Sequence, residues 1–224
     1  MKKVGILGGT GNIGEGLARR ICLGGKFDVA IGSRGADKAQ LAADGVCACL
    51  KERNFTAATC TGGTNADICD SDILILSLPF ERIASTIETI GKEKFENKII
   101  VSLINPMVRN PAEKYFLPDA PADGSAALAI QKMLPASAKL CCAFNNVAAG
   151  KWMELEQELD YTVAVCGDDE EAKKAVMELV ASVSRLVPLD AGPLAMSKVI
   201  EGITPLVITI AMRNGLKDVG VYFK

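Results

Sequence analysis

The residues with the clearest chemical meaning form a glycine-rich stretch near the start of the chain. An apolar run precedes this stretch and a helical pattern follows it, and three of its glycines, Gly9, Gly11 and Gly14, have the spacing Gly-x-Gly-x-x-Gly. In that context glycine allows a tight turn, close approach of a pyrophosphate to the backbone, and contact between helix and strand. The pattern predicts a dinucleotide at the helix N-terminus, whose free N–H groups favour phosphate. The alternative is a glycine turn with a purely structural role.

The end of the second predicted strand indicates which dinucleotide binds. A site for NAD usually has Asp or Glu there, about 20 residues beyond the glycines, to bind the ribose 2′-hydroxyl. This chain has Gly32-Ser33-Arg34 instead. A serine hydroxyl and a guanidinium favour a 2′-phosphate through charge-assisted hydrogen bonds, and Lys38 adds a second positive charge one helical turn later. NADP(H) is therefore the predicted cofactor, unless Arg34 is only a solvated loop residue.

The chain lacks the usual proton donors of carbonyl reduction. It contains no histidine, and none of its three tyrosines, Tyr115, Tyr161 and Tyr222, precedes a lysine in the Tyr-x-x-x-Lys pattern of short-chain dehydrogenases. Reduction of a carbonyl usually needs a proton donor beside the hydride. Transfer of a hydride between two bound cofactors can proceed through alignment alone. We therefore expect no catalytic acid or base among the side chains.

Composition excludes several classes of protein. The chain has 224 residues, of which 49% are apolar and 23% charged, and its net charge is −2. These values are typical of a globular protein and do not favour a nucleic-acid partner. The start of the chain shows no signal-peptide pattern, and the longest apolar run, Leu206 to Met212, is too short to cross a bilayer. We expect a cytoplasmic protein without a membrane partner.

Eight cysteines are present, but their spacing predicts no metal site. No Cys-x-x-Cys pair occurs, and the group Cys47, Cys49, Cys60 and Cys69 fits no standard zinc or iron–sulfur pattern. The simpler interpretation is a set of small buried thiols in a reducing cytosol.

Strand and helix patterns alternate along the chain. Strands are expected at 3–7, 28–32, 57–60, 73–78, 98–104, 140–144, 162–166 and 186–189, and helices at 12–23, 36–50, 81–90, 125–134, 170–182 and from Leu194 onward. This rhythm predicts an α/β fold, a doubly wound parallel sheet (Rossmann) with a small C-terminal α/β extension. We expect an NADP-binding domain over residues 1–135 and a smaller part over 136–224 that forms the second cofactor pocket and subunit contacts.

Helix ends and irregular segments are also predicted. Four prolines suggest that residues 105–124 form a long irregular connection, after which Asp123 or Ser125 caps a helix. The acidic run 168–171 is expected to cap the next helix. Thr204-Pro205 allows two interpretations, a proline within one helix or a Thr204 cap with Pro205 at the first position of a second helix.

Several motifs together resemble one family. These are Gly5 to Gly14, Gly32 to Arg34, Cys166 to Asp169, Leu189 to Leu194 and Thr204 to Leu206. They are similar to the coenzyme F420-dependent NADP oxidoreductases of archaea and actinobacteria, and the resemblance extends from Lys3 to Phe223. It implies reversible hydride transfer between C4 of NADPH and C5 of the 5-deazaflavin coenzyme F420.

The resemblance also implies roles for individual residues. NADP is expected at Gly9, Thr10, Gly11, Asn12, Ile13, Gly14, Ser33, Arg34 and Lys38, with Ser77, Leu78 and Pro79 near the ribose and nicotinamide. The deazaflavin is expected near the segment 145–148, which includes Asn145, Val147 and Ala148, near 191–194, and near Thr204. Asn145 departs from some archaeal relatives, which carry histidine there. Simpler interpretations are that Ser77 to Pro79 ends a strand, Asn145 and Asn146 cap a helix, and 191–194 is a turn.

Two other functions and an oligomeric state complete the expectations. The chain could reduce another small hydride acceptor such as a flavin with NADPH, or it could be a non-catalytic NADPH-sensing module. The segment Leu206 to Met212 is apolar on most faces of a helix and needs cover on more than one side. A homodimer is expected on that basis, as the resemblance also implies; the alternative is a helix that fills the core of its own subunit.

Overall fold

A single eight-stranded sheet organises the molecule. The computed structural model describes residues 1–55, 57–217 and 219–223. The sheet has the strand order β10-β9-β8-β5-β4-β1-β2-β3. The strands are β1 (Lys2–Leu7), β2 (Phe27–Ser33), β3 (Cys60–Thr64), β4 (Ile73–Leu76), β5 (Ile99–Ser102), β8 (Lys139–Cys142), β9 (Tyr161–Gly167) and β10 (Leu186–Asp190). The predicted Rossmann architecture is confirmed, and the last three strands extend the same sheet.

Strand direction places the functional region. β1 pairs in parallel with both β2 and β4, so the chain reverses its winding at β1. In a doubly wound sheet the crevice at the carboxyl ends of such strands is where ligands bind. β8 and β9 form the one antiparallel pair of this sheet among the described residues, through Cys141 with Gly167 and Cys142 with Cys166. β9 therefore runs opposite to the strands that precede it.

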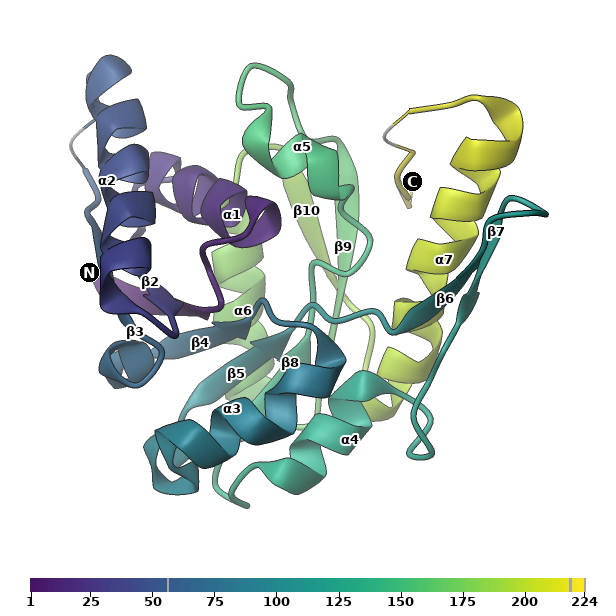
Figure 1. The fold of residues 1–224 in the computed structure, drawn as a ribbon, viewed down its shortest axis with the longest axis horizontal. Helices are drawn as coiled ribbons and strands as arrows, with labels where there is room; N and C mark the ends of the chain where they lie inside the picture. Colours follow the sequence, from purple (N-terminus) through teal and green to yellow (C-terminus); the bar gives the residue numbers. More distant parts are fainter. Residues whose placement is uncertain (56, 218, 224) are drawn as a thin grey trace.

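Helices cover both faces of the sheet, as Figure 1 shows. One apolar cluster joins the sheet to α1 (Asn12–Leu23), α2 (Ala36–Glu52), α5 (Ala149–Met153) and α6 (Glu170–Ser182). A second cluster lies on the other face with α3 (Ile83–Ile90), α4 (Ala126–Met133) and the start of α7 (Ser197–Asn214). Short 3₁₀ helices occupy Asp67–Asp70, Phe80–Arg82, Lys92–Phe95 and Leu194–Met196. The inner strands of the sheet thus contribute side chains to two separate cores, because successive side chains point to opposite faces.

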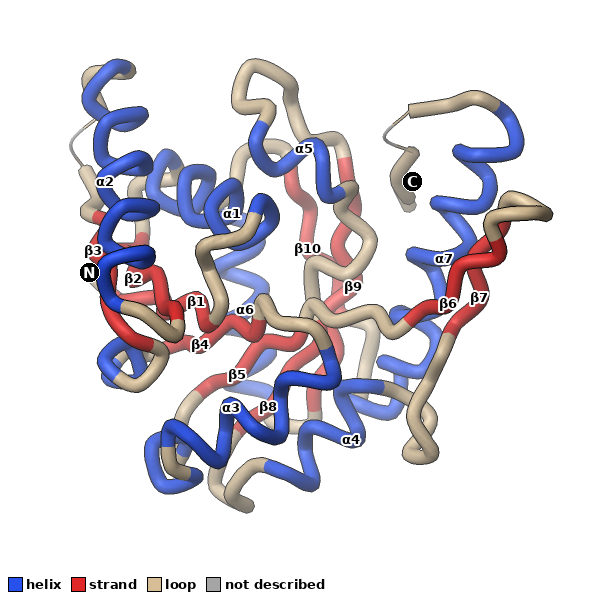
Figure 2. The backbone as a smooth tube through the Cα atoms, viewed as in Figure 1, coloured by secondary structure: helices blue, strands red, loops and turns tan. Residues whose placement is uncertain are grey.

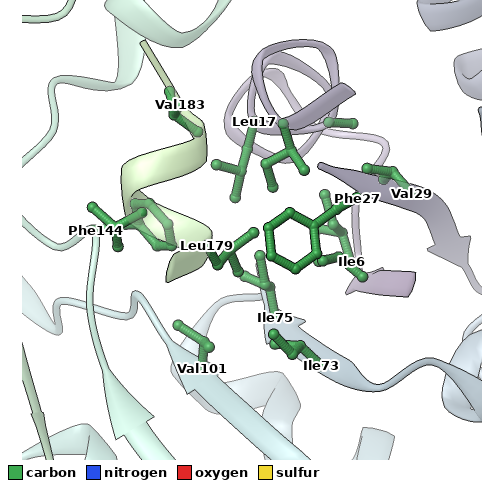
Figure 3. Packing of buried hydrophobic residues seen from close by; sticks show 14 of the residues in the cluster. Ile6, Leu17, Phe27, Val29, Ile73, Ile75, Val101, Phe144, Leu179 and Val183 are labelled. Atoms are coloured by element: carbon green, nitrogen blue, oxygen red, sulfur yellow. The ribbon is translucent and has the colours of Figure 1, made fainter. Parts of the chain in front are cut away.

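The first core fixes the position of the glycine-rich turn. Figure 3 shows Leu17 of α1 and Leu179 of α6 directed at Ile6 and Ile75 of the central strands, with the Phe27 ring beside them. Leu17 and Ile6 are completely buried. Because these side chains hold α1 against β1, the turn that joins the two elements has a defined shape.

One strand is displaced from its predicted position, and one helix was not predicted. β3 occupies Cys60–Thr64 rather than 57–60. Gly62 and Gly63 weaken the strand pattern in the sequence. A Cβ on Gly62 would lie 2.3 Å from the main-chain nitrogen of Gln40 in α2, so the close packing of β3 on α2 requires glycine there. The five-residue helix α5 was not predicted, since it is too short to show a helical period.

The segment predicted as irregular contains a hairpin. β6 (Met107–Asn110) and β7 (Tyr115–Pro118) pair antiparallel and lie along α7, as Figure 2 shows. The Phe116 N–H donates to Thr209 Oγ1 of α7 at 2.8 Å. The prediction was wrong because prolines were taken as breakers, whereas three of the four, Pro106, Pro111 and Pro118, lie next to or at the ends of the two strands, where proline is tolerated.

α7 is one continuous helix with Pro205 inside it. The interpretation of Thr204 as the cap of a second helix is therefore wrong. The stretch from Leu194 to Asn214 has a mean hydropathy of 1.5 and is long and apolar enough to cross a membrane by length and composition alone, a criterion that core helices of other proteins also meet. The expectation that no apolar run is long enough to cross a bilayer was based on residues 206–212, which are only one third of this stretch.

The predicted caps are confirmed. Ser125 caps α4 by accepting a hydrogen bond from the Leu128 N–H, and Asp169 caps α6 by accepting one from the Ala172 N–H at 2.8 Å. The cysteines are free and seven of the eight are buried, whereas Cys47 is exposed. Burial raises the pKa of Cys69 to about 11 and that of Cys141 to about 12, so both remain protonated thiols near neutral pH.

Candidate functional site

The glycine-rich turn connects β1 to α1 and is held by main-chain hydrogen bonds. The Gly9 N–H donates to the carbonyl oxygens of Ile6 at 3.1 Å and of Gly32, in β2, at 2.9 Å. A Cβ on Gly14 would lie 2.6 Å from the Gly9 Cα. Gly9 and Gly14 are therefore required by the packing of the helix on the turn.

Gly11 has a different reason to be glycine. A Cβ there would meet no other part of the chain within 4 Å, and Gly11 caps α1 without any side-chain hydrogen bond. The helix makes its first hydrogen bond from the Glu15 N–H to the Gly11 carbonyl, so the preceding N–H groups of Asn12 and Ile13 lie before the helical ladder begins. Thr10 is half-buried and Asn12 is exposed at this end. The open space and free N–H groups suit a pyrophosphate.

The end of β4 lies against the same turn. The Ser77 N–H donates to the Leu7 carbonyl at 3.0 Å. A Cβ on Gly8 would lie 2.3 Å from the Leu78 side chain, and Gly8 has φ +69°, so both space and backbone conformation demand glycine. Pro79 follows and is exposed. Ser77, Leu78 and Pro79 are thus at the switch point of the sheet beside the turn, as a ligand contact requires.

Asn65 is a positioning residue that the sequence prediction missed. Its Oδ1 accepts a hydrogen bond from the Gly8 N–H at 3.1 Å, and its own N–H donates to the Ser33 carbonyl at 2.8 Å. It joins the glycine-rich turn to the end of β2 and is buried. The available signal was a polar residue directly after a strand, which was lost because β3 was predicted four residues too early.

Positive charge gathers where β2 ends. Ser33 is buried, whereas Arg34 and Lys38 are exposed. Within residues 1–55, 57–217 and 219–223, neither Arg34 nor Lys38 forms an ion pair. Both charges are therefore available to an anion, and no carboxylate occupies the 33–34 position to repel one.

A cavity of about 400 Å³ lies next to the first turn of α1. Five predicted site residues line it, namely Ile13, Asn145, Val147, Ala148 and Thr204. Asn146, which belongs to the predicted segment 145–148, lines it as well. The sequence prediction missed the others, which are Leu103, Asn105, Met107, Phe144, Ala149, Trp152, Val207, Ile208, Ala211, Met212, Leu216 and Val219. None of these described lining residues is ionisable, and most are apolar. The cavity therefore suits a flat, largely apolar ligand.

Asn145 is buried and joins three elements at the cavity wall. Its Nδ2 donates to Asn105 Oδ1 at 3.0 Å and to the Ile104 carbonyl at 3.3 Å, while its Oδ1 accepts from Cys142 Sγ at 3.1 Å. Its carbonyl accepts from Asn105 Nδ2 and from the Thr204 hydroxyl. The side-chain amide is thus engaged by the protein, and it fixes the ends of β5 and β8.

The interpretation of Asn145 and Asn146 as helix caps is wrong. Ala148 is the N-cap of α5, and no side chain caps that helix. Asn146 instead donates from Nδ2 to the Thr162 carbonyl of β9 at 2.8 Å. Both asparagines shape the cavity by connecting strands.

The segment 191–194 does not line this cavity. The Ala191 N–H donates to the Val165 carbonyl, the Gly192 carbonyl accepts from the Gly167 N–H, and Leu194 is completely buried in the second core. β9 runs antiparallel to β8 and β10 follows β9, so the chain after β10 lies beside the start of β8. The structure therefore does not bring 191–194 together with the predicted residues that line the cavity, and a deazaflavin contact at 191–194 stays a prediction.

A second cavity, of about 530 Å³, lies between α1, α2 and the loop after α5. It contains none of the predicted site residues, and its lining includes Arg19, Glu52 and Arg53. In the part of the chain that the structure describes, no group of three or more Cys, Asp or Glu side chains could hold a metal ion.

Comparisons with known proteins agree on one family. The family described as NADP oxidoreductase, coenzyme F420-dependent, matches residues 3–106. The F420-dependent NADP reductase of Methanocaldococcus jannaschii is 39% identical over 98% of this chain and 96% of its own length. The enzyme of the same name from Methanothermobacter marburgensis is 31% identical over 98% and 96%.

Solved structures share the fold. A protein from an Arthrobacter species, described as a possible F420-dependent NADP reductase, superimposes with a TM-score of 0.75 at 23% identity, and the match covers both chains completely. A reductive aminase from Aspergillus terreus, solved with NADPH and ethyl levulinate, reaches 0.62 at 15% identity over 96% of this chain and 62% of the aminase. At these identities the likeness concerns the fold alone.

Proposed function

Because the chain belongs to the family of coenzyme F420-dependent NADP oxidoreductases, we propose that its switch-point turn and its 400 Å³ cavity are the two halves of one active site. The protein is an enzyme that transfers a hydride reversibly between NADP(H) and coenzyme F420. NADP(H) and F420 supply the hydride chemistry, and the chain supplies binding and alignment.

The dinucleotide lies across the carboxyl ends of β2, β1 and β4. Its pyrophosphate binds the first turn of α1 beside Gly11, where no side chain occupies the space. Its 2′-phosphate binds Ser33, Arg34 and Lys38, and the nicotinamide end passes Ser77, Leu78 and Pro79. The open space at Gly11 and the charges of Arg34 and Lys38 after β2, which are unpaired among the described residues, support this assignment, as does the position of the turn at the switch point of the sheet.

One observation carries the placement of the hydride acceptor. Ile13 belongs to the first turn of α1 and also lines the cavity, so a nicotinamide near the turn and a ring in the cavity lie next to each other. Asn145, Val147, Ala148 and Thr204 form other parts of the wall. The deazaflavin ring therefore occupies the cavity.

The chain contributes alignment rather than proton transfer. The described lining residues include no acid, base, cysteine or tyrosine. Hydride transfer between two rings needs near contact and correct orientation, which can contribute several kcal/mol. The apolar wall excludes water, and the network around Asn145 keeps the wall rigid.

The assay for this function uses the protein with NADPH and oxidised F420. Loss of the visible absorbance of the deazaflavin is expected, together with oxidation of NADPH in equal amount. Flavin in place of F420 should give no comparable rate. If NADPH-binding protein leaves F420 unchanged but reduces flavin, the flavin reductase function replaces this one. If it reduces neither, it is a sensing module.

The two parts of the chain have different roles in this proposal. Residues 1–135 carry the dinucleotide, and residues 136–224 form most of the acceptor wall and the subunit contacts. We place the enzyme in the cytoplasm, which the eight free cysteines favour because reducing compartments keep thiols reduced.

A homodimer completes the proposal, and an apolar stripe on α7 supports it. Val199 and Leu206 are about 60% exposed and Ile210 is 40% exposed, while Ile203 between them is half-buried. These residues recur every three or four positions, which places them on one side of the helix. Val207 and Pro205 face inward and are buried. The inner side thus serves the subunit itself, and the stripe meets a second copy.

A further inference from the structure

The chain turns back toward the sheet after α7. Gly215 ends the helix in the left-handed conformation with φ +65°, and the Leu216 N–H donates to the Ala211 carbonyl at 2.9 Å. In Figure 2 the loop beyond α7 returns on the side of α7 that faces α5 and β9. We call residues 216–217 and 219–223 the return segment.

Thr162 of β9 anchors the return segment. Its N–H donates to the Val221 carbonyl at 3.1 Å, and its Oγ1 accepts from the Phe223 N–H at 3.1 Å. β8 pairs with β9 only at Cys166 and Gly167, so the β8 side of β9 is free at Thr162. The return segment fills part of this open edge.

The same anchor also contacts the cavity wall. The Thr162 carbonyl accepts from Asn146 Nδ2 at 2.8 Å, and Asn146 lines the cavity. Thr162 is 1% exposed. A single buried residue therefore fixes the return segment and the cavity wall relative to each other.

Gly220 allows the return segment to lie flat on β9. A Cβ there would be 1.8 Å from the Tyr161 ring atom Cε1, and the ring is buried. Gly220 does not have a positive φ, so space rather than backbone conformation requires glycine. Any larger side chain must displace either the ring or the segment.

Two side chains of the return segment complete the cavity. Leu216 and Val219 line it together with Ala211 and Met212 of α7. We propose that Leu216 and Val219 are specificity-determining residues for the hydride acceptor, and that docking at Thr162 and Gly220 holds them against its ring. This inference rests on the proposed function, because it requires the acceptor to occupy the cavity. The ligand class that fits is a planar heteroaromatic ring system.

The test compares Gly220→Val with Gly202→Ala. The valine displaces the return segment, whereas a Cβ on Gly202 of α7 would meet only Pro118 Cγ at 3.9 Å. Gly220→Val should raise the KM for F420 roughly tenfold or more with kcat little changed, because contacts made equally in ground and transition state affect KM. The KM for NADPH should stay within about twofold, and Gly202→Ala should match wild type in all three constants.

Two further variants keep the test decisive if Gly220→Val folds poorly. Leu216→Ala removes an apolar contact without displacing the segment, and Thr162→Val removes the acceptor for the Phe223 N–H. Both should raise the KM for F420 by smaller factors. Trypsin cleavage at Lys217 should become faster in Gly220→Val and slower when oxidised F420 is added.

The inference fails if Leu216→Ala and Gly220→Val leave the KM for F420 unchanged in an otherwise active enzyme. That result would leave the proposed function intact, since wild type would still reduce F420. If wild type neither binds nor reduces F420, the function and this inference both fail. Equal increases in the KM for F420 and in the KM for NADPH in Leu216→Ala would also overturn the inference, because they would indicate a general structural role for Leu216.

Discussion

The Thr204 hydroxyl of α7 donates a 2.5 Å hydrogen bond to the main-chain carbonyl of Asn145, which follows β8. A threonine within a helix often bonds to the carbonyl four residues earlier in its own helix. Here the bond leaves the helix and connects two walls of the cavity. The distance between α7 and the end of β8 is therefore set by a polar contact rather than by apolar packing alone.

Loss of the Thr204 hydroxyl, which makes this bond, or of the Asn145 side-chain amide, which bonds to Asn105 and Ile104, should misalign the site without stopping the reaction. Thr204→Val and Asn145→Ala should each lower kcat by up to about 10²-fold, the order expected when bound groups shift by about 1 Å. Thr204→Ser keeps the hydroxyl and should retain most of the rate. Steady-state kinetics with NADPH and F420 measure the effect. A loss of about 10⁴-fold or more with both ligands still bound would indicate general acid–base catalysis instead.

The pH dependence of stability should reveal the buried Glu201 of α7. Its carboxylate accepts hydrogen bonds from the N–H groups of Ala126 at 2.7 Å and Ala127 at 2.9 Å, at the start of α4. Burial raises its pKa above the ordinary value of 4.5, and the two N–H donors oppose that rise only in part. The folded protein therefore holds this proton more tightly than the unfolded chain does.

It follows that the free energy of unfolding loses the Glu201 contribution as pH rises from below 4.5 through the raised pKa. Urea unfolding of wild type and Glu201→Gln across this pH range isolates the effect, because other carboxylates titrate in both proteins. The free energy of unfolding of wild type, relative to that of Glu201→Gln, should fall as pH increases. A difference that is constant with pH, or that shifts in favour of wild type, would contradict the raised pKa.

Two glycines of the turn should respond in opposite ways to alanine. A Cβ at Gly11 meets open space, whereas one at Gly14 would lie 2.6 Å from the Gly9 Cα. Gly11→Ala should keep the melting temperature of wild type but weaken NADPH binding, because the methyl group occupies space meant for the pyrophosphate. Gly14→Ala should destabilise the fold by about 1–3 kcal/mol, as overpacking does. Thermal unfolding and NADPH titration distinguish the two variants. Unchanged NADPH affinity in Gly11→Ala would show that the pyrophosphate does not bind beside Gly11.

Arg34 should determine the preference between the two nicotinamide dinucleotides. Arg34→Ala removes a charge-assisted hydrogen bond to the 2′-phosphate and should cost roughly 1.5–3 kcal/mol of NADPH binding. NADH lacks that phosphate, so its affinity should hardly change. Titration calorimetry with both dinucleotides gives the comparison. Equal losses for NADPH and NADH would show that Arg34 has a structural role.

The oligomeric state should depend on the exposed stripe of α7. Wild type should sediment at about twice the mass of 23.6 kDa, and Leu206→Asp should yield folded monomers. Leu41→Asp on α2 is the matched control, because Leu41 is also exposed, at 73%, but lies outside the stripe. Ile208 is less suitable for this test because it lines the cavity. A wild-type mass near 24 kDa at micromolar concentration would rule the dimer out.

The sequence by itself determined most strands of the large sheet and most of the helices that cover it, and it predicted a dinucleotide at the turn after β1. Apolar runs alternating with helical periods predicted the sheet, and α1 and α6 begin and end where expected. Gly9, Gly11 and Gly14 could be identified because their spacing is local, within one turn between adjacent elements. Ser33 and Arg34 followed from the same local unit. A short-range sequence pattern is sufficient to predict a binding feature when one β-strand, one α-helix and the turn between them form all of it.

Only the tertiary structure decided how distant segments form the 400 Å³ cavity. Asn105, Trp152 and Leu216 come from three separate parts of the chain, and no spacing in the sequence connects them. The reversal of β9 also moved the segment 191–194 away from the cavity, because strand direction depends on pairing and not on the residues of the segment itself. Asn65 reached the turn only through the register of β3 with β2. Contacts between residues far apart in sequence require the folded sheet, which brings them together by packing and hydrogen bonding.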